Sequence, residues 1–81
     1  MKNSPWGSKE GETSTKLQIV TDLARSAQQE LDAIADYKAR ATSAGVAGDD
    51  ATVKVYEHII PQEEEHFREF TRRLRELGVE G

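Results

Sequence analysis

The residues best suited to chemistry in this chain are a glutamate and a histidine three positions apart, Glu63 and His66. On a helix, side chains three positions apart project from nearly the same face, so this carboxylate and this imidazole would lie side by side. Carboxylate oxygens and imidazole nitrogens are both ligands of divalent first-row metals. The Glu-x-x-His spacing therefore predicts part of a metal site, provided that the segment is helical and that other elements supply further ligands.

Glu63 also stands where an apolar residue is expected. Residues at alternating steps of three and four form the seam that a packed helix turns toward its neighbours. Here this seam reads Val53, Tyr56, Ile60, Glu63, Phe67, Phe70, Leu74 and Leu77. A lone carboxylate at such a position is costly unless it is paired or bound to a metal. A single polar residue can also serve only to fix the packing register, and that alternative remains open.

A further carboxylate is predicted on a second helix. Glu30 is the only glutamate within residues 15–43, and it shares a stripe with Leu23, Ala27, Ile34, Tyr37 and Ala41. In ferritin-like bundles a di-metal site takes one Glu from each of two helices and a Glu-x-x-His from each of two others. One chain offers half of this set, with Glu30, Glu63 and His66 as the candidate ligands. Two chains related by a two-fold axis would supply all six ligands for a di-iron centre.

Two helices joined by a short loop must position these ligands. Helical spacing of apolar residues predicts α-helices over about 15–43 and about 50–77. Between them lies the loop-like "SAGVAGDD", in which Gly45 is expected to end the first helix and Asp49 or Asp50 to cap the second.

Pro61 falls inside the second helix, where proline removes a hydrogen bond. The seam keeps its register on both sides of Pro61, so one kinked helix is favoured over two separate ones. The predicted fold class is all-α: an antiparallel two-helix hairpin over 15–78. A disordered tail is expected over 1–14 and a short tail over 79–81.

Composition restricts how such a hairpin can be stable. The chain has 81 residues, of which 36% are hydrophobic, and it has no cysteine. A chain this small buries little surface, so a partner subunit or a metal is the expected source of additional stability. Two hairpins can cover their apolar stripes by dimerising into a ferritin-like four-helix bundle. The dimer that the core requires and the dimer that the ligand count requires are the same assembly.

The charge and the apolar runs exclude several classes of partner. The net charge of -4 argues against nucleic-acid binding, which favours a basic surface. No apolar run is long enough for a transmembrane helix, and the first residues lack the apolar core of a secretory signal. We therefore expect a cytoplasmic protein with no membrane partner.

Other polar residues of the second helix are expected to be structural. Glu64 and Glu65 point away from the seam and are placed to pair with Arg68 or Arg72 at helical spacing. His58 lies off the main stripe and is predicted to be a surface or inter-subunit histidine rather than a ligand. Tyr37 and Tyr56 belong to the predicted core, and Tyr37 could also border the metal centre.

The residues from about 17 to about 77 resemble the encapsulated ferritins. The resemblance rests on "ELDAIADYKARA", on a short loop containing "DD", and on "EEEHFREF". In that family a Glu precedes a Tyr by seven residues, as Glu30 precedes Tyr37, and a Glu-x-x-His follows on the next helix. The chain departs from the family where Gln29 and Asp32 replace an acidic metal-entry cluster.

The resemblance implies a function, a cofactor and an assembly. Encapsulated ferritins are ferroxidases that oxidise Fe(II) to Fe(III) at a di-iron centre between two subunits. By resemblance, Glu30, Glu63 and His66 would be the catalytic metal ligands and Tyr37 would lie just outside them. The homodimers would assemble into a larger ring, a decamer by resemblance, inside an encapsulin nanocompartment that stores iron. Two alternatives stay open: a rubrerythrin-like peroxidase, and a non-catalytic helical module that mediates oligomerisation.

Overall fold

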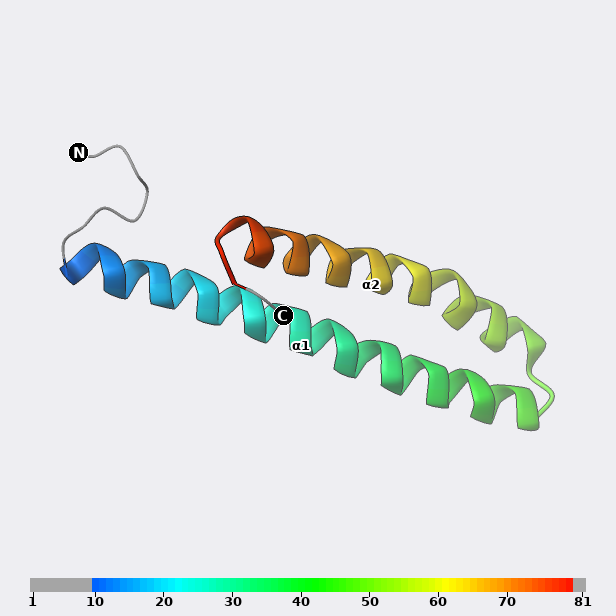
Figure 1. Cartoon of the computed structure of the whole chain (residues 1–81). Coiled ribbons are helices and arrows are strands. Elements are labelled where there is room, and N and C mark those ends of the chain that lie inside the picture. Colours follow the sequence, from blue (N-terminus) through cyan, green and yellow to red (C-terminus); the bar gives the residue numbers. More distant parts are fainter. Residues whose placement is uncertain (1–9, 80–81) are drawn as a thin grey trace.

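The computed structural model is a hairpin of two long α-helices (Figure 1). It describes the backbone of residues 10–79 and the side chains of residues 15–79. Helix α1 spans Glu10–Val46 and helix α2 spans Asp50–Glu76. The two helices lie against one another in opposite directions and no strand occurs in the described residues, so the predicted all-α hairpin is confirmed. Neither helix contains a stretch long and apolar enough to cross a membrane.

Helix α1 starts earlier in the chain than predicted. Helix α1 begins at Glu10, whereas the prediction placed its start at about residue 15. Residues 10–14, expected to belong to a disordered tail, are thus helical, and the rest of that expected tail lies outside the described residues.

The end of α1 also differs from the prediction. Gly45 was expected to end the helix, but α1 continues to Val46 and the left-handed residue is Gly48, with φ of 78°. The backbone N–H of Asp49 donates to the carbonyl of Ala44, and that of Gly48 donates to the carbonyl of Gly45. This pair of bonds is the Schellman motif, which needs a residue of positive φ at the first position after the helix cap, the residue whose N–H makes the inner of the two bonds, and that residue is Gly48 rather than Gly45.

Helix α2 begins as the sequence predicted. Asp49 is its N-cap: the carboxylate accepts hydrogen bonds from the backbone N–H of Thr52 at 3.1 Å and from the Thr52 hydroxyl at 2.6 Å. These two donors lower the pKa of Asp49 below its ordinary value. Helix α2 then runs through Pro61 as a single element, as favoured. It ends at Glu76, and Gly78, with φ of 90°, closes it with a second Schellman motif.

The hairpin has a thin core. Among the described side chains, the buried hydrophobic residues are Ala27, Ile34 and Leu77, and no residue within α2 is buried. Other members of the predicted seams are half-buried between the helices. Tyr37 of α1 and Tyr56 of α2 stack at a centroid distance of 5.6 Å. The apolar seams therefore meet as predicted, but two helices alone leave much of their apolar surface accessible.

Candidate metal centre

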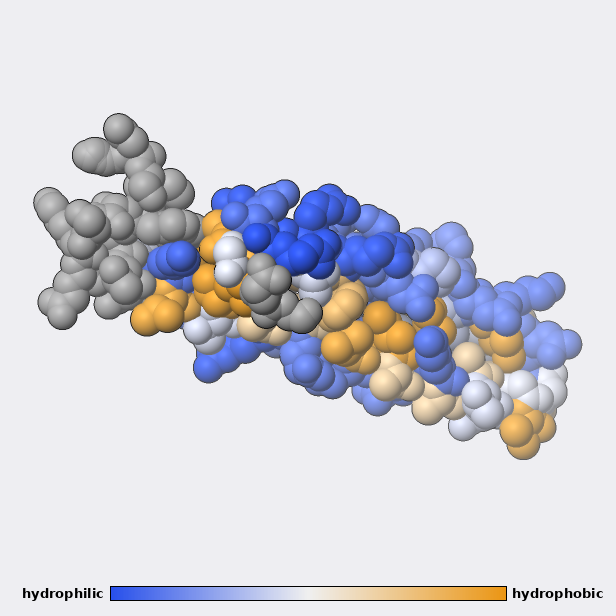
Figure 2. All heavy atoms as spheres, in the orientation of Figure 1, coloured by the Kyte–Doolittle hydropathy of each residue, from blue (hydrophilic) through white to orange (hydrophobic). Residues whose placement is uncertain are grey.

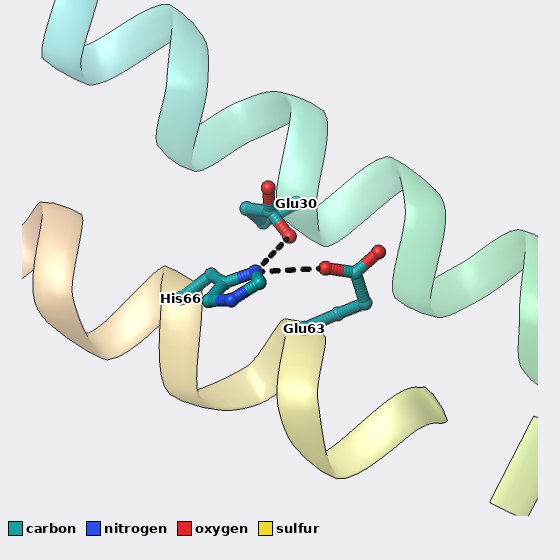
Figure 3. Close-up of side chains that lie close together, drawn as sticks. All are labelled: Glu30, Glu63 and His66. Atoms are coloured by element: carbon teal, nitrogen blue, oxygen red, sulfur yellow. Dashed lines mark hydrogen bonds and ion pairs between the residues drawn. The ribbon is translucent and has the colours of Figure 1, made fainter. Parts of the chain in front are cut away.

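The three predicted ligand residues come together across the hairpin (Figure 3). Glu30 projects from α1, while Glu63 and His66 project from α2 toward it. One ligand atom from each residue lies within 4.8 Å of the others. Sequence spacing predicted that Glu63 and His66 would be neighbours. Their approach to Glu30 depends on how the two helices pack, and the structure shows that they do meet.

The distances within this cluster are unequal. The imidazole Nδ1 of His66 lies 3.0 Å from Oε1 of Glu63 and 3.8 Å from Oε1 of Glu30. The first distance is that of a hydrogen bond. When Glu63 is ionised its carboxylate can only accept, so the donor is then the N–H of the tautomer that is protonated at Nδ1. The second distance is too long for a hydrogen bond but is within the range of an electrostatic interaction. Glu30 is thus the least satisfied member of the cluster.

The two carboxylate side chains of the cluster are more buried than its histidine. The side chains of Glu30 and Glu63 are 21% and 20% exposed, whereas that of His66 is 53% exposed. Oε1 of Glu30 is shielded from solvent and has no hydrogen-bond partner. A shielded carboxylate oxygen without a donor is unfavourable, so the fold keeps Glu30 here at a cost that a bound cation would offset.

The electrostatics of Glu30 agree with its geometry. Burial is the largest cause that raises the pKa of Glu30, and the neighbouring Glu63 carboxyl raises that pKa further. His66 acts in the opposite direction and lowers it. Without a metal, ionised Glu30 and ionised Glu63 repel one another in a partly desolvated place. A divalent cation bound between them would attract both carboxylates and so offset their mutual repulsion.

The residues present fit a metal ion by donor type and by spacing. With metal–ligand bonds of about 2.0–2.2 Å, two adjacent ligand atoms of a six-coordinate ion lie about 3 Å apart. The distance of 3.0 Å between His66 and Glu63 matches this value, and the 3.8 Å distance to Glu30 needs only a small side-chain adjustment. Two carboxylates and one imidazole suit iron, manganese or zinc. Three protein donors would leave coordination positions open for a further carboxylate from a second chain, for water or for an oxidant.

Tyr37 does not join the cluster through a hydrogen bond. Among the described residues its recorded contact is the ring of Tyr56. Tyr37 follows Glu30 by seven residues and Tyr56 precedes Glu63 by seven, so the tyrosine pair lies two turns from the cluster on both helices. The sequence assigned both tyrosines to the core, but it gave no sign that the two rings stack.

The remaining polar predictions also have outcomes. Glu65 pairs with Arg68 at 2.8 Å, and this pairing lowers the pKa of Glu65. His58 is exposed and lies 3.3 Å from the side-chain nitrogen of Gln62, away from the cluster, which confirms that it is a surface residue of the single chain.

Comparison with known proteins identifies no relative: no protein-family model, no curated protein and no solved structure matches this chain.

Proposed function

We propose that this protein is a ferroxidase that oxidises Fe(II) to Fe(III) at a di-iron centre shared by two copies of the chain. The observation that carries the proposal is the convergence of Glu30, Glu63 and His66 from two helices, with a shielded oxygen of Glu30 left without a donor. Ferrous iron is both the substrate and the cation that this donor set suits.

The ligand count is the reason for invoking two copies. Each hairpin contributes two carboxylates and one imidazole, and the full set of a carboxylate-bridged di-metal site in a four-helix bundle is twice that number. The exposed flank of His66 leaves one side of the cluster accessible to a partner. In this arrangement Glu63 would be the ligand shared by the two ions, because it occupies the seam of α2, while Glu30 and His66 would each hold one ion.

The side chains also control protons at the site. Metal ligands must be deprotonated, so binding requires Glu30 to be ionised, and binding through Nδ1 of His66 requires that this nitrogen carry no proton. The imidazole then carries its proton on Nε2. When bound, each ferrous ion would give one electron to the oxidant, dioxygen or peroxide. The protein residues hold the ions in place and neutralise their charge.

The resemblance to encapsulated ferritins extends the proposal to assembly and location. On this proposal the homodimers form a larger ring, and the ring passes its ferric product to the lumen of an encapsulin compartment for storage. These statements rest on the motif resemblance alone.

The test is aerobic iron oxidation by the purified protein, followed through the absorbance of the oxo-ferric product. Glu63→Ala should lose iron binding and oxidation together, whereas His66→Ala should weaken binding and keep some oxidation, because the bridge remains. Glu57→Ala, an exposed glutamate on the same helix, is the matched control and should oxidise iron at the wild-type rate. Wild-type oxidation by Glu63→Ala would show that another carboxylate bridges the ions or that no such centre forms.

A non-catalytic oligomerisation module is the second candidate function. It is favoured by the exposed apolar residues, which include Leu17, Leu31 and Val55. In that case anaerobic titration should detect no iron binding, while the chain still self-associates. A rubrerythrin-like peroxidase would differ from a ferroxidase by turning over hydrogen peroxide continuously when a reductant is supplied.

A further inference from the structure

Two tyrosines face one another across the hairpin, between the candidate metal centre and the loop. They are the only two tyrosines of the chain, Tyr37 on α1 and Tyr56 on α2. Their ring centroids lie 5.6 Å apart and their ring planes are inclined by 35°. Each helix thus presents one phenol to the other helix, and no further tyrosine of the same chain competes for either ring.

The packing around the two rings keeps them together. Both rings are half-buried. One turn away along each helix lie apolar side chains that are buried or half-buried: Ile34, Ala41, Val53 and Ile60. Figure 2 shows apolar side chains gathered in a band along the hairpin, bordered above and below by hydrophilic ones. The two rings therefore stay neighbours for as long as the helices stay paired.

The two hydroxyl groups can release their protons to water. Among the described residues none hydrogen-bonds to the hydroxyl of Tyr37 or of Tyr56, and neither hydroxyl oxygen is shut off from solvent. A phenol that has lost one electron is a strong acid, so its proton passes to water at once. Each ring can therefore be oxidised to a neutral phenoxyl radical without help from a protein base.

The pair is also the preferred target of an oxidant in this part of the chain. Residues 10–79 contain no cysteine, methionine or tryptophan, so the two tyrosines are the side chains there that lose one electron most easily. Seven residues separate each tyrosine from the candidate glutamate ligand on its own helix, a distance of about 10.5 Å along the axis. Electrons tunnel through protein over such distances, so an oxidising equivalent formed at the cluster can reach the rings.

We propose that Tyr37 and Tyr56 are an oxidative cross-linking site, at which an intramolecular dityrosine joins α1 to α2. Each phenol loses one electron and one proton, and a carbon–carbon bond forms between ring carbons adjacent to the hydroxyl-bearing ones. The hydrogens of the two bonded carbons move to the oxygens, which restores both hydroxyls. Hydrogen peroxide takes up the two electrons and two protons, its O–O bond breaks, and two water molecules form. The rings must approach by about 1 Å, which is within the amplitude of ordinary side-chain motion.

The source of the peroxide rests on the proposed function, whereas the pair itself does not. A ferroxidase that passes two electrons and two protons to dioxygen releases hydrogen peroxide, and one coupling event removes one molecule of it. The bond formed would hold the two helices together two turns from Glu30 and Glu63. It would also restrict the unfolded chain, as a disulfide does, and so stabilise the hairpin.

The first test supplies the oxidant without metal. The full chain, with a chelator, is illuminated with a ruthenium complex and persulfate, which remove single electrons from tyrosine, and is then digested with trypsin. Wild type should give the peptides 26–38 and 55–68 joined and lighter by two hydrogens, from a product with the mass of one chain. Tyr37→Phe and Tyr56→Phe, which keep the rings, should give no such product.

A matched control keeps two tyrosines but separates them. The double variant Tyr56→Phe, His58→Tyr moves one tyrosine to the exposed face of α2 and should lose the intrachain product. Circular dichroism establishes that every variant retains its helices. Equal intrachain yields from wild type and the double variant, or joined peptides that come only from two different chains, would overturn the proposal.

The second test separates the cross-link from the proposed function. Ferrous iron in air replaces the ruthenium complex, and wild type is compared with Glu63→Ala and with the exposed control Glu57→Ala. Wild type and Glu57→Ala should form the intrachain link and Glu63→Ala should lose it, while all three form it under illumination. A link formed under illumination but not with iron would disprove the source of the peroxide and confirm the site, whereas no link by either route would disprove the site. Linked wild type should unfold at a higher urea concentration than the unlinked chain, and equal midpoints would contradict a bond that ties α1 to α2.

Discussion

Nδ1 of His66 lies 0.8 Å closer to Glu63, on its own helix, than to Glu30 on the other helix, at 3.0 Å against 3.8 Å. The shorter distance follows from helix geometry, since residues three apart are neighbours on any α-helix. The longer one depends on the packing of α1 against α2. Glu30 is therefore the ligand whose position reports on the tertiary fold and on whatever fills the space between the helices.

Replacing Glu30 should stabilise the metal-free protein. Its pKa is raised by burial and then by Glu63, so the folded state prefers the protonated form. A raised pKa contributes stability to the folded state that is fully present below the ordinary pKa of 4.5. This contribution is lost as the pH rises through the raised pKa of Glu30. Glu30→Gln should thus raise the midpoint of urea unfolding at pH 7 in the presence of a chelator, and the gain should shrink at pH 4. Glu57→Gln, which changes an exposed glutamate, should show neither effect. A lower midpoint for Glu30→Gln at pH 7 would contradict the cost that we assign to the shielded carboxylate.

If two chains share one metal centre, adding an inactive variant should reduce the activity of the wild-type chains. Wild-type protein at fixed concentration is titrated with the double variant Glu30→Ala, Glu63→Ala under conditions in which subunits exchange. Each mixed dimer would contain only the wild-type half of the ligand set, so iron oxidation per wild-type chain should fall as the variant is added. Constant activity, with mixed dimers verified by mass spectrometry, would show that each chain holds a complete site.

Gly45 and Gly48 should respond in opposite ways to the same substitution. Gly48 has a positive φ, where an alanine is strained, so Gly48→Ala should destabilise the hairpin by about 1 kcal/mol or more. Gly45 lies inside α1, and a Cβ there would meet Cγ2 of Val53 at 3.7 Å, an ordinary contact. Gly45→Ala should therefore stabilise by up to about 1 kcal/mol through helix propensity. The measurement is the midpoint of urea unfolding of each variant at equal protein concentration. Equal changes of the midpoint in the two variants would contradict the assignment of Gly48 as the residue that ends α1.

The cap of α2 should make stability depend on acidity. The two donors of Thr52 lower the pKa of Asp49 from its ordinary value of 3.8. A lowered pKa contributes stability that is present above that ordinary value and is lost as the pH falls through the lowered one. Asp49→Ala should therefore lower the thermal midpoint at pH 7, and the difference from wild type should narrow in strong acid. Asp49→Ser, which keeps a capping oxygen, should retain most of the stability at both pH values.

The parts of the fold that could be predicted are those set by periodicity. The two seams and the hairpin follow from spacing along the chain, as does the placement of Glu30 on the face that meets α2. Residue type narrowed the cap of α2 to Asp49 or Asp50, and the structure has Asp49. The ends of α1 could not be read in this way, because a helix end depends on the competition between caps and on backbone φ. The motif that ends α1 needs Gly48, and nothing in the local spacing ranks Gly48 above Gly45.

In the candidate site, too, some features could be predicted from the sequence and others could not. Local spacing predicted that Glu63 and His66 would be adjacent, and the shared stripe predicted the side of α1 that carries Glu30. The shielding of the Glu30 oxygen and the stacking of Tyr37 on Tyr56 depend on the rotation of each helix about its axis, which a sequence pattern leaves open. The binding of iron stays a prediction.

The absence of any buried residue within α2 has a consequence for how this protein behaves at different concentrations. A helix that its own chain covers only partly gains the rest of its burial from neighbours, so unfolding and dissociation become one coupled equilibrium. We therefore expect the midpoint of thermal unfolding to rise with protein concentration, as it does for obligate oligomers and does not for an independent monomeric domain. For such a chain, dilution acts in the same direction as a denaturant.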